Sequence, residues 1–145
     1  MPSEMEWYIP GRMVYVREDG DLQLHEVQAA NETARIFLEE SPEPLYFLID
    51  RTNLESAPKS LSGLIGVLDT LRHQNFGCAV IFGQSNNRYF RALTKFLARY
   101  FGINVQEVDT FEQALHFLIE LDSELGPLIQ QKERHRLSKM SHGGD

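Results

Sequence analysis

Apolar residues follow two different patterns along the chain, and the two patterns alternate. Two short runs, over about residues 45–49 and 78–82, are continuously apolar, which is typical of strands covered on both faces of a sheet. A third predicted strand spans about residues 103–108. Four longer stretches carry apolar residues at helical spacing, which predicts amphipathic helices; they span about residues 22–40, 59–74, 86–101 and 110–121. Strand formers on both sides of the turn signal Pro10-Gly11 predict an N-terminal hairpin.

This alternation predicts an α/β fold with the element order β-β-α-β-α-β-α-β-α. A strand, a helix and the next parallel strand form a right-handed unit, so the three predicted strands should lie parallel in one sheet. The N-terminal hairpin would add an antiparallel edge to that sheet. We expect a single domain over residues 1–122. A polar, partly basic tail over residues 123–145 would follow, either loosely ordered or folded as a short helix.

Composition narrows the class of protein without naming its activity. The net charge of −7 at pH 7 argues against nucleic-acid binding, which requires a basic surface. No apolar run approaches the roughly 18 residues of a transmembrane segment, and the N-terminus lacks the basic and apolar regions of a signal peptide. The single cysteine, Cys78, excludes a disulfide within the chain. We therefore expect a cytoplasmic protein.

Polar residues gather where the predicted parallel strands end. Ligand-facing groups in such a sheet collect outside the carboxyl ends of the strands. The surface that we expect to meet a partner or ligand consists of residues that follow the first two parallel strands: Asp50, Asn53, Ser60, Ser62, Gly63, Ser85, Asn86 and Arg88.

The stretch APKSLSGLIGVL, residues 57–68, opens the second predicted helix and places two serines at its start. Serine oxygens accept hydrogen bonds from the free backbone N–H groups at such a position, and Ser60 is the favoured cap. The same N–H groups stabilise anions, so a phosphoserine would also fit there and would add about −1.5 to −2 charges. Residue type alone leaves both a cap and a phosphorylation switch open, and Gly63 would leave the neighbouring surface free of a side chain.

The hairpin and helix at the start, the run LYFLID, the later KSLSGL and the continuation through FEQALHFL resemble the STAS domain over about residues 7–120. STAS domains form the anti-sigma-factor antagonist family, whose D-S-S-G-L-like motif is phosphorylated on its second serine by a partner kinase. Ser62-Gly63-Leu64 is similar to the last part of that motif, so the resemblance implies Ser62 as the phosphorylation candidate. The chain departs from the motif at Ser60 and Leu61, which stand in place of the aspartate and the first serine.

A divergent STAS-like branch of largely uncharacterised bacterial proteins is the more similar group. Its members often open with an IPGR-V-YV hairpin, which residues 9–16 resemble through Ile9-Pro10-Gly11-Arg12 and Val14-Tyr15-Val16. The resemblance implies a module that binds a protein or a small ligand, usually without catalysis.

A basic stripe is expected on the third helix. Arg88, Arg91, Lys95 and Arg99 fall within an arc of about 80° on a helical wheel, and no acidic residue lies between residues 86 and 101. The stripe is either the solvated face of a core helix or a docking surface for an acidic partner or an anionic lipid headgroup.

No motif for catalysis, metal binding or cofactor binding stands out, because the five histidines lack metal-ligand spacing and the common phosphate-binding and nucleophile motifs are absent. We expect no enzyme activity, no metal and no cofactor. The first functional hypothesis is a STAS-like module that binds a protein partner. The alternative is a small apolar or anionic, lipid-like ligand in a pocket between the sheet and the third helix, lined by Phe82, Phe90 and Leu93. Self-association as a homodimer through the N-terminal edge strand or the tail is a further expectation.

Overall fold

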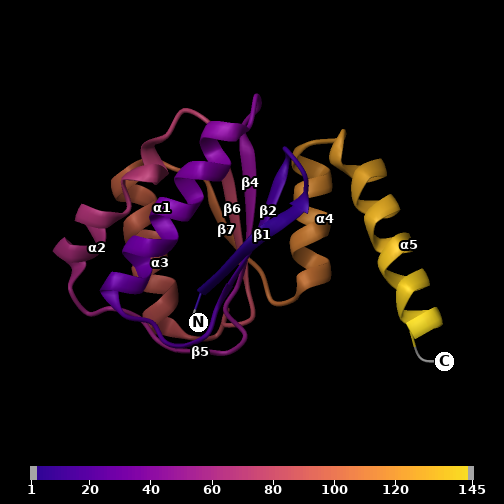
Figure 1. Cartoon of the computed structure of the whole chain (residues 1–145). Coiled ribbons are helices and arrows are strands. Elements are labelled where there is room, and N and C mark those ends of the chain that lie inside the picture. Colours follow the sequence, from indigo (N-terminus) through magenta and orange to yellow (C-terminus); the bar gives the residue numbers. More distant parts are fainter. Residues whose placement is uncertain (1–2, 144–145) are drawn as a thin grey trace.

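The structure is a computed structural model that describes the backbone of residues 3–143 and the side-chain surroundings of residues 4–138. Its centre is a five-stranded sheet in the order β1-β2-β4-β6-β7 (Figure 1). The strands are β1 (Ser3–Ile9), β2 (Met13–Glu18), β4 (Leu45–Asp50), β6 (Phe76–Phe82) and β7 (Val105–Glu107). β1 and β2 pair antiparallel, and β2, β4, β6 and β7 run parallel to one another. The predicted α/β class, with a mostly parallel sheet and an antiparallel N-terminal edge, is therefore confirmed.

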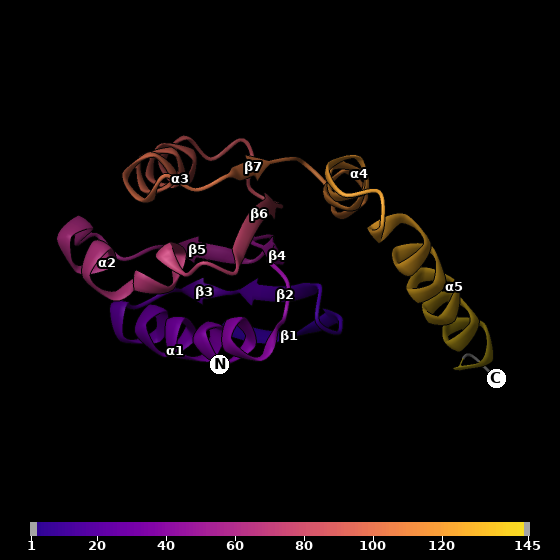
Figure 2. The same cartoon turned by 90° about the horizontal axis from the view of Figure 1, so that it is seen from above.

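Helices cover both faces of the sheet (Figures 1 and 2). One face carries α1 (Leu24–Glu40), α2 (Leu61–Val67) and α3 (Arg88–Phe101), and the other carries α4 (Phe111–Leu121) and α5 (Leu125–Gly143). Both faces of the central strands are buried for this reason. Phe47 of β4 packs in the cluster that holds Leu38 of α1, whereas its neighbour Leu48 packs in the cluster that holds Leu118 of α4. This arrangement explains why the apolar runs show no polar alternation.

The second predicted helix, over residues 59–74, is shorter than its apolar spacing suggests. α2 ends at Val67, and a separate 3₁₀ turn, η1, spans Asp69–Arg72. The buried side chain of Asn31 on α1 accepts hydrogen bonds from the backbone N–H of Thr70, at 3.3 Å, and from its hydroxyl, at 2.5 Å. A backbone donor that bonds to a side chain cannot continue the α-helical ladder, so a residue on α1 ends the helix.

A second, two-stranded parallel sheet had no signal in the sequence. It pairs β3 (Gly20–Asp21) with β5 (Leu54–Ser56). Backbone bonds from Gly20 to Asn53 and from Leu22 to Ser56 extend the pairing. The loop between β4 and α2 is thereby tied to the segment before α1.

The expected polar tail is a 19-residue helix over its described part, and residues 144–145 lie outside the described residues. Leu125 is fully buried and Ile129 nearly so, both in the cluster that α4 forms with the sheet. Further along, the hydroxyl of Tyr8 on β1 donates to the carboxylate of Glu133. The packed unit therefore continues past the boundary expected at residue 122, because the first turns of α5 complete the core on this face.

Candidate functional site

The carboxyl ends of β4, β6 and β7 meet at one edge of the sheet, as the parallel strand order requires. Asp50, at the end of β4, accepts hydrogen bonds from the hydroxyl of Tyr15 at 2.5 Å and from the backbone N–H of Thr52 at 2.9 Å. Burial, followed by this bond, raises the pKa of Tyr15 above its usual value. Asp50 therefore has a structural role that the sequence did not indicate.

The loops that follow β4 and β6 are held tightly together. Gly83 has a φ of 103°, and a Cβ there would lie 2.6 Å from the backbone nitrogen of Thr52, so only glycine allows the approach. The side-chain amide of Gln84 donates to the carbonyl oxygens of Thr52 and Leu54 at 3.2 Å each. Ser85 donates to the carboxylate of Asp109, which follows β7. Three strand ends are thus linked side by side.

The remaining predicted residues near this edge are exposed. Asn53 and Asn86 face solvent, and the cap of α3 is Asn87, whose side-chain oxygen accepts from the N–H of Phe90 at 3.0 Å. Arg88 follows it in the first turn, also exposed. Its side chain forms no ion pair with any residue that the structure describes.

The two serines at the start of α2, Ser60 and Ser62, have different roles. Ser60 is the N-cap, as expected, and its hydroxyl oxygen accepts from the N–H of Gly63 at 3.0 Å. Ser62 lies within α2, is exposed, and has its hydroxyl 3.5 Å from that of Ser60. The Ser62 hydroxyl is therefore not needed for the cap.

Gly63 has a different role from the open surface expected for it. A Cβ at this position would lie 2.8 Å from Cδ2 of Leu24 and 2.9 Å from the Ser60 hydroxyl oxygen. Glycine thus allows α2 to pack closely against the first turn of α1.

The predicted surface residues fall into two groups. Asp50 and Ser85 belong to the linked strand ends, whereas Ser60, Ser62 and Gly63 sit beside α1. Within residues 4–138, no hydrogen bond or ion pair joins one group to the other.

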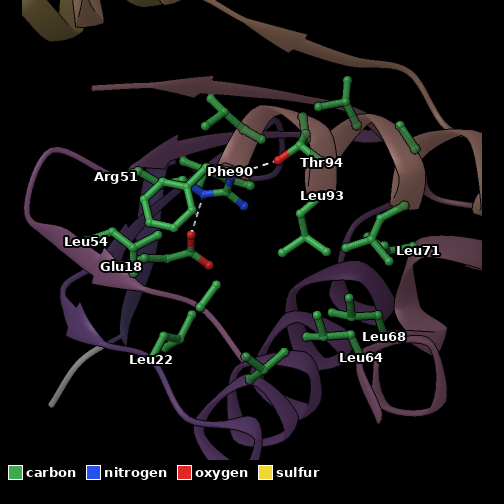
Figure 3. Close-up of a pocket in the computed structure, with 18 of the residues that line it drawn as sticks. Glu18, Leu22, Arg51, Leu54, Leu64, Leu68, Leu71, Phe90, Leu93 and Thr94 are labelled. Carbon is green, nitrogen blue, oxygen red and sulfur yellow. Dashed lines mark hydrogen bonds and ion pairs between the residues drawn. The ribbon is translucent and has the colours of Figure 1, made fainter. Parts of the chain in front are cut away.

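A cavity of about 160 Å³ lies between the sheet and the helices α2 and α3 (Figure 3). Its wall is mostly apolar. Figure 3 shows Phe90 and Leu93 of α3 facing it, with Leu64, Leu68 and Leu71 on the side of α2 and η1. The volume is similar to that of engineered apolar cavities of roughly 150 Å³ that bind benzene. Two of the three residues expected to line this pocket do so. Phe82 does not, because its ring packs on the opposite face of the sheet with Phe111.

One corner of the cavity is polar. Arg51 donates from Nε to the carboxylate of Glu18 and from Nη1 to the hydroxyl of Thr94, each at 2.8 Å (Figure 3). The side chains of both members of the ion pair are only 18% exposed. A ligand in the cavity would therefore meet apolar carbon over most of its surface and a hydrogen-bonded ion pair at one end.

Sequence reasoning did not single out Glu18, Arg51 or Thr94 as parts of this pocket. The register of the sheet places Arg17 opposite Asp50, so the next residues, Glu18 and Arg51, also lie opposite each other. Knowing that β2 pairs with β4 would have been enough to predict this ion pair. The contribution of Thr94 depends on how α3 packs, which the sequence does not show.

The side chains of the basic stripe are exposed to solvent, as predicted. Arg88, Arg91, Lys95 and Arg99 are all exposed on α3. Tyr89, Phe96 and Tyr100 are also exposed, as a separate aromatic side of the same helix.

No group of three or more His, Cys, Asp and Glu side chains in the described part of the chain could hold a metal ion. Among the described helices, none is both long and apolar enough to cross a membrane.

Comparison with known proteins gives matches in structure alone. No protein-family model matches the chain, and no curated protein matches it. An uncharacterised protein of the DUF3478 family from Shewanella loihica PV-4, solved with a SpoIIAA-like fold, matches with a TM-score of 0.58 and 17% identity. The match covers 80% of this chain and 91% of that one.

Two structures of SpoIIAA also match. The anti-sigma factor antagonist SpoIIAA in its unphosphorylated form has a TM-score of 0.50 and 17% identity, over 81% of this chain and 97% of that one. The phosphorylated form of the Bacillus cell fate determinant SpoIIAA has a TM-score of 0.48 and 20% identity, over 80% of this chain and 98% of that one. The first of these and the Shewanella protein, together with the strand order, show that the chain has the SpoIIAA-like fold of a STAS-like domain.

Proposed function

We propose that the chain is a non-catalytic regulatory module that binds a protein partner through the helix start at Ser60 and Ser62. The observation that carries this proposal is the exposed hydroxyl of Ser62, which lies beside a cap that Ser60 alone supplies. A charge added at Ser62 leaves the cap intact and changes the surface. One protein of this fold is described as an anti-sigma factor antagonist in its unphosphorylated form, which supports a regulator that binds protein and is modified.

The absence of catalysis is part of this proposal. The two aspartates at the carboxyl edge of the sheet, Asp50 and Asp109, both already accept hydrogen bonds, from Tyr15 and Ser85. The thiol of Cys78 is buried, and burial raises its pKa to about 11, so it is a poor nucleophile at neutral pH. A single buried thiol also suits the cytoplasm, where we place the module.

Phosphorylation of Ser62 is a subordinate proposal. Incubation with candidate kinases, followed by intact-mass measurement and peptide mapping, should show one added phosphate on Ser62. Modification elsewhere with Ser62 untouched would contradict it. Binding is tested separately by capture of partners on wild-type chain, on Ser62→Asp and on Ser138→Asp, a matched change at an exposed serine of α5. We expect one specific partner to be lost with Ser62→Asp alone; equal loss with both variants, or with neither, would refute a role for Ser62.

A second candidate function is favoured by the cavity between the sheet and α3. A small apolar or lipid-like molecule would bury its carbon atoms against Phe90 and Leu93 and place an acceptor near Arg51. Native mass spectrometry of freshly purified protein should then show a non-covalent adduct. Leu93→Trp, which fills the cavity, should remove the adduct, whereas Leu137→Trp on the exposed side of α5 should retain it. A bare chain in every preparation would exclude tight binding.

A homodimer through the edge strand β1 is a third arrangement that we propose to test. β1 lies at the margin of the sheet, where its outer backbone groups could pair with another strand. Sedimentation velocity should show a dimer that dissociates on dilution. A monomer at all concentrations would refute it.

A further inference from the structure

The opposite margin of the sheet is formed by the short strand β7. The sheet ends at β7, and Figure 2 shows no described element outside it, only α3 and α4 to either side. The carbonyl of Asn104 accepts from Ala79, and the N–H of Val108 donates to Ile81. Residues of a parallel strand bond alternately to its two sides, so the N–H and C=O groups of Val105 and Glu107 point away from β6. They form an open edge that can bind another strand.

A groove of about 320 Å³ runs between this edge and α3. Its strand wall is Val105, Gln106 and Glu107. Its helix wall includes Arg91, Lys95 and Arg99, which are three of the four members of the basic stripe. Arg88, the fourth, does not line it.

The cations of the groove form no ion pair within the described part of the chain, unlike most of the other arginines. Arg12, Arg17, Arg35 and Arg51 each form an ion pair with an acidic side chain. By contrast, the side chains of Arg91, Lys95 and Arg99 form no ion pair with a described residue. Glu107 lines the same groove and interacts electrostatically with Arg91 and Lys95, and burial raises the pKa of its carboxyl. Three cations and one carboxylate line the groove, so in a chain of net charge −7 it is a local excess of positive charge.

The spacing of these cations matches an extended chain. Arg91, Lys95 and Arg99 are four residues apart, which places successive members about 6 Å apart along the helix axis. Every second side chain of a strand points to the same face, and these side chains are about 6.6 Å apart. A strand with an acidic residue at every second position would therefore present its carboxylates at nearly the interval at which α3 presents its cations.

We propose that this groove binds an acidic protein segment in extended conformation, which adds a strand beside β7. The backbone of the segment bonds to the outward N–H and C=O groups of Val105 and Glu107. Its alternate acidic side chains pair with Arg91, Lys95 and Arg99, and its other side chains face away from α3. This is strand addition with charge as the source of specificity. The groove is separate from the Ser62 surface, so the inference goes beyond the proposed function and can fail without it.

The test uses a labelled seven-residue peptide of alternating threonine and glutamate, with a control peptide of the same composition in which the glutamates are adjacent. We expect saturable binding of the alternating peptide by fluorescence anisotropy. Slower hydrogen exchange should accompany it at the amides of Val105 and Glu107. Absence of binding at millimolar peptide, or equal binding of the two peptides, would overturn the proposal.

A pair of charge reversals on α3 separates the groove from general attraction. Lys95 lines the groove, whereas Arg88 lies on the same helix outside it. The variants Lys95→Glu and Arg88→Glu therefore make the same reversal of charge inside and outside the groove. The new glutamate at position 95 gains favourable i±4 pairs with Arg91 and Arg99, so the helix is not at risk. We expect Lys95→Glu to weaken peptide binding about tenfold and Arg88→Glu less than twofold. Equal losses of peptide affinity in the two variants would refute the proposed groove. The proposal would also be refuted if the chain bound anionic phosphatidylserine vesicles in a way that depends on Lys95 but did not bind the peptide.

Discussion

Leu125 provides the sharpest test of whether α5 belongs to the domain. Its side chain is fully buried in the first turn of α5, in the core between the sheet and α4. Leu137, three turns further along the same helix, is 54% exposed. The same substitution at the two positions therefore changes the same residue type in two opposite environments.

The expected loss follows from what alanine removes at position 125. About three buried carbon groups at roughly 0.8 kcal/mol each give about 2.4 kcal/mol of lost transfer free energy. A cavity that the surroundings cannot fully collapse adds to this, and buried leucine-to-alanine changes cost about 2–5 kcal/mol in total. Because α5 packs against the core on one side only, some relaxation is expected. We predict that Leu125→Ala lowers the free energy of unfolding by about 3 kcal/mol.

Urea denaturation followed by far-UV circular dichroism measures this free energy. Leu137→Ala should stay within about 0.5 kcal/mol of wild type, as surface changes usually do. A loss below about 1 kcal/mol for Leu125→Ala, equal to that for Leu137→Ala, would refute the reasoning. In that case α5 would dock too weakly to stabilise the domain, and the boundary at residue 122 would stand.

Three further predictions test local features. Gly66→Ala should stabilise the folded chain by roughly 0.5–1 kcal/mol through helix propensity, since nothing lies near its added Cβ. Gly63→Ala should be less stable than Gly66→Ala by at least about 1 kcal/mol, because its Cβ would meet Leu24 and the capping oxygen of Ser60. Thermal unfolding of the two variants measures the difference. Burial raises the pKa of Glu107, so its contribution to stability is present below the unfolded pKa and is lost as pH rises through the folded one. Glu107→Gln should therefore gain stability over wild type as the pH rises above about 4, where the unfolded carboxyl begins to ionise, and a difference in urea titrations that stays constant with pH would contradict this. The thiol of Cys78 is buried and has a pKa of about 11, so at pH 8 roughly one molecule in a thousand carries it as the thiolate. It should react with a thiol reagent only when the chain unfolds, and rapid labelling of the native protein would disprove its burial.

The order of the elements could be predicted from the sequence because each central strand is buried on both faces. Phe47 and Leu48 point to opposite helical layers, so the apolar run had to be continuous, and no other pattern suits a covered parallel strand. The cap of α2 was also predictable, because the Ser60 hydroxyl accepts a hydrogen bond from a backbone N–H three residues away. These features depend only on local spacing.

The features that sequence reasoning missed depend on contacts between distant residues. Asn31 ends α2 through Thr70, which lies 39 residues further along the chain. Phe82 does not line the predicted pocket, because successive residues of a strand face opposite sides of the sheet. Ile81 faces the pocket and Phe82 faces α4. The core role of α5 depends on Leu125 and Ile129, with Leu128 packed beside them, and the rest of the helix is mostly polar. Three apolar residues within its first two turns are too weak a pattern to predict a packed helix of this length.

The site at Ser62 is also constrained in a way that limits how it can act. α2 is fixed on several sides: Ser60 caps it, Gly63 lets it pack closely against Leu24, and Leu64 is buried beside the cavity. The preceding segment is paired through β5, and Gln84 holds its backbone. A phosphate on Ser62 would therefore find little freedom to move the helix. It would act through the charge and the hydrogen-bond acceptors that it adds to an existing surface, so a partner would distinguish the two forms by electrostatic fit and not by a change of fold.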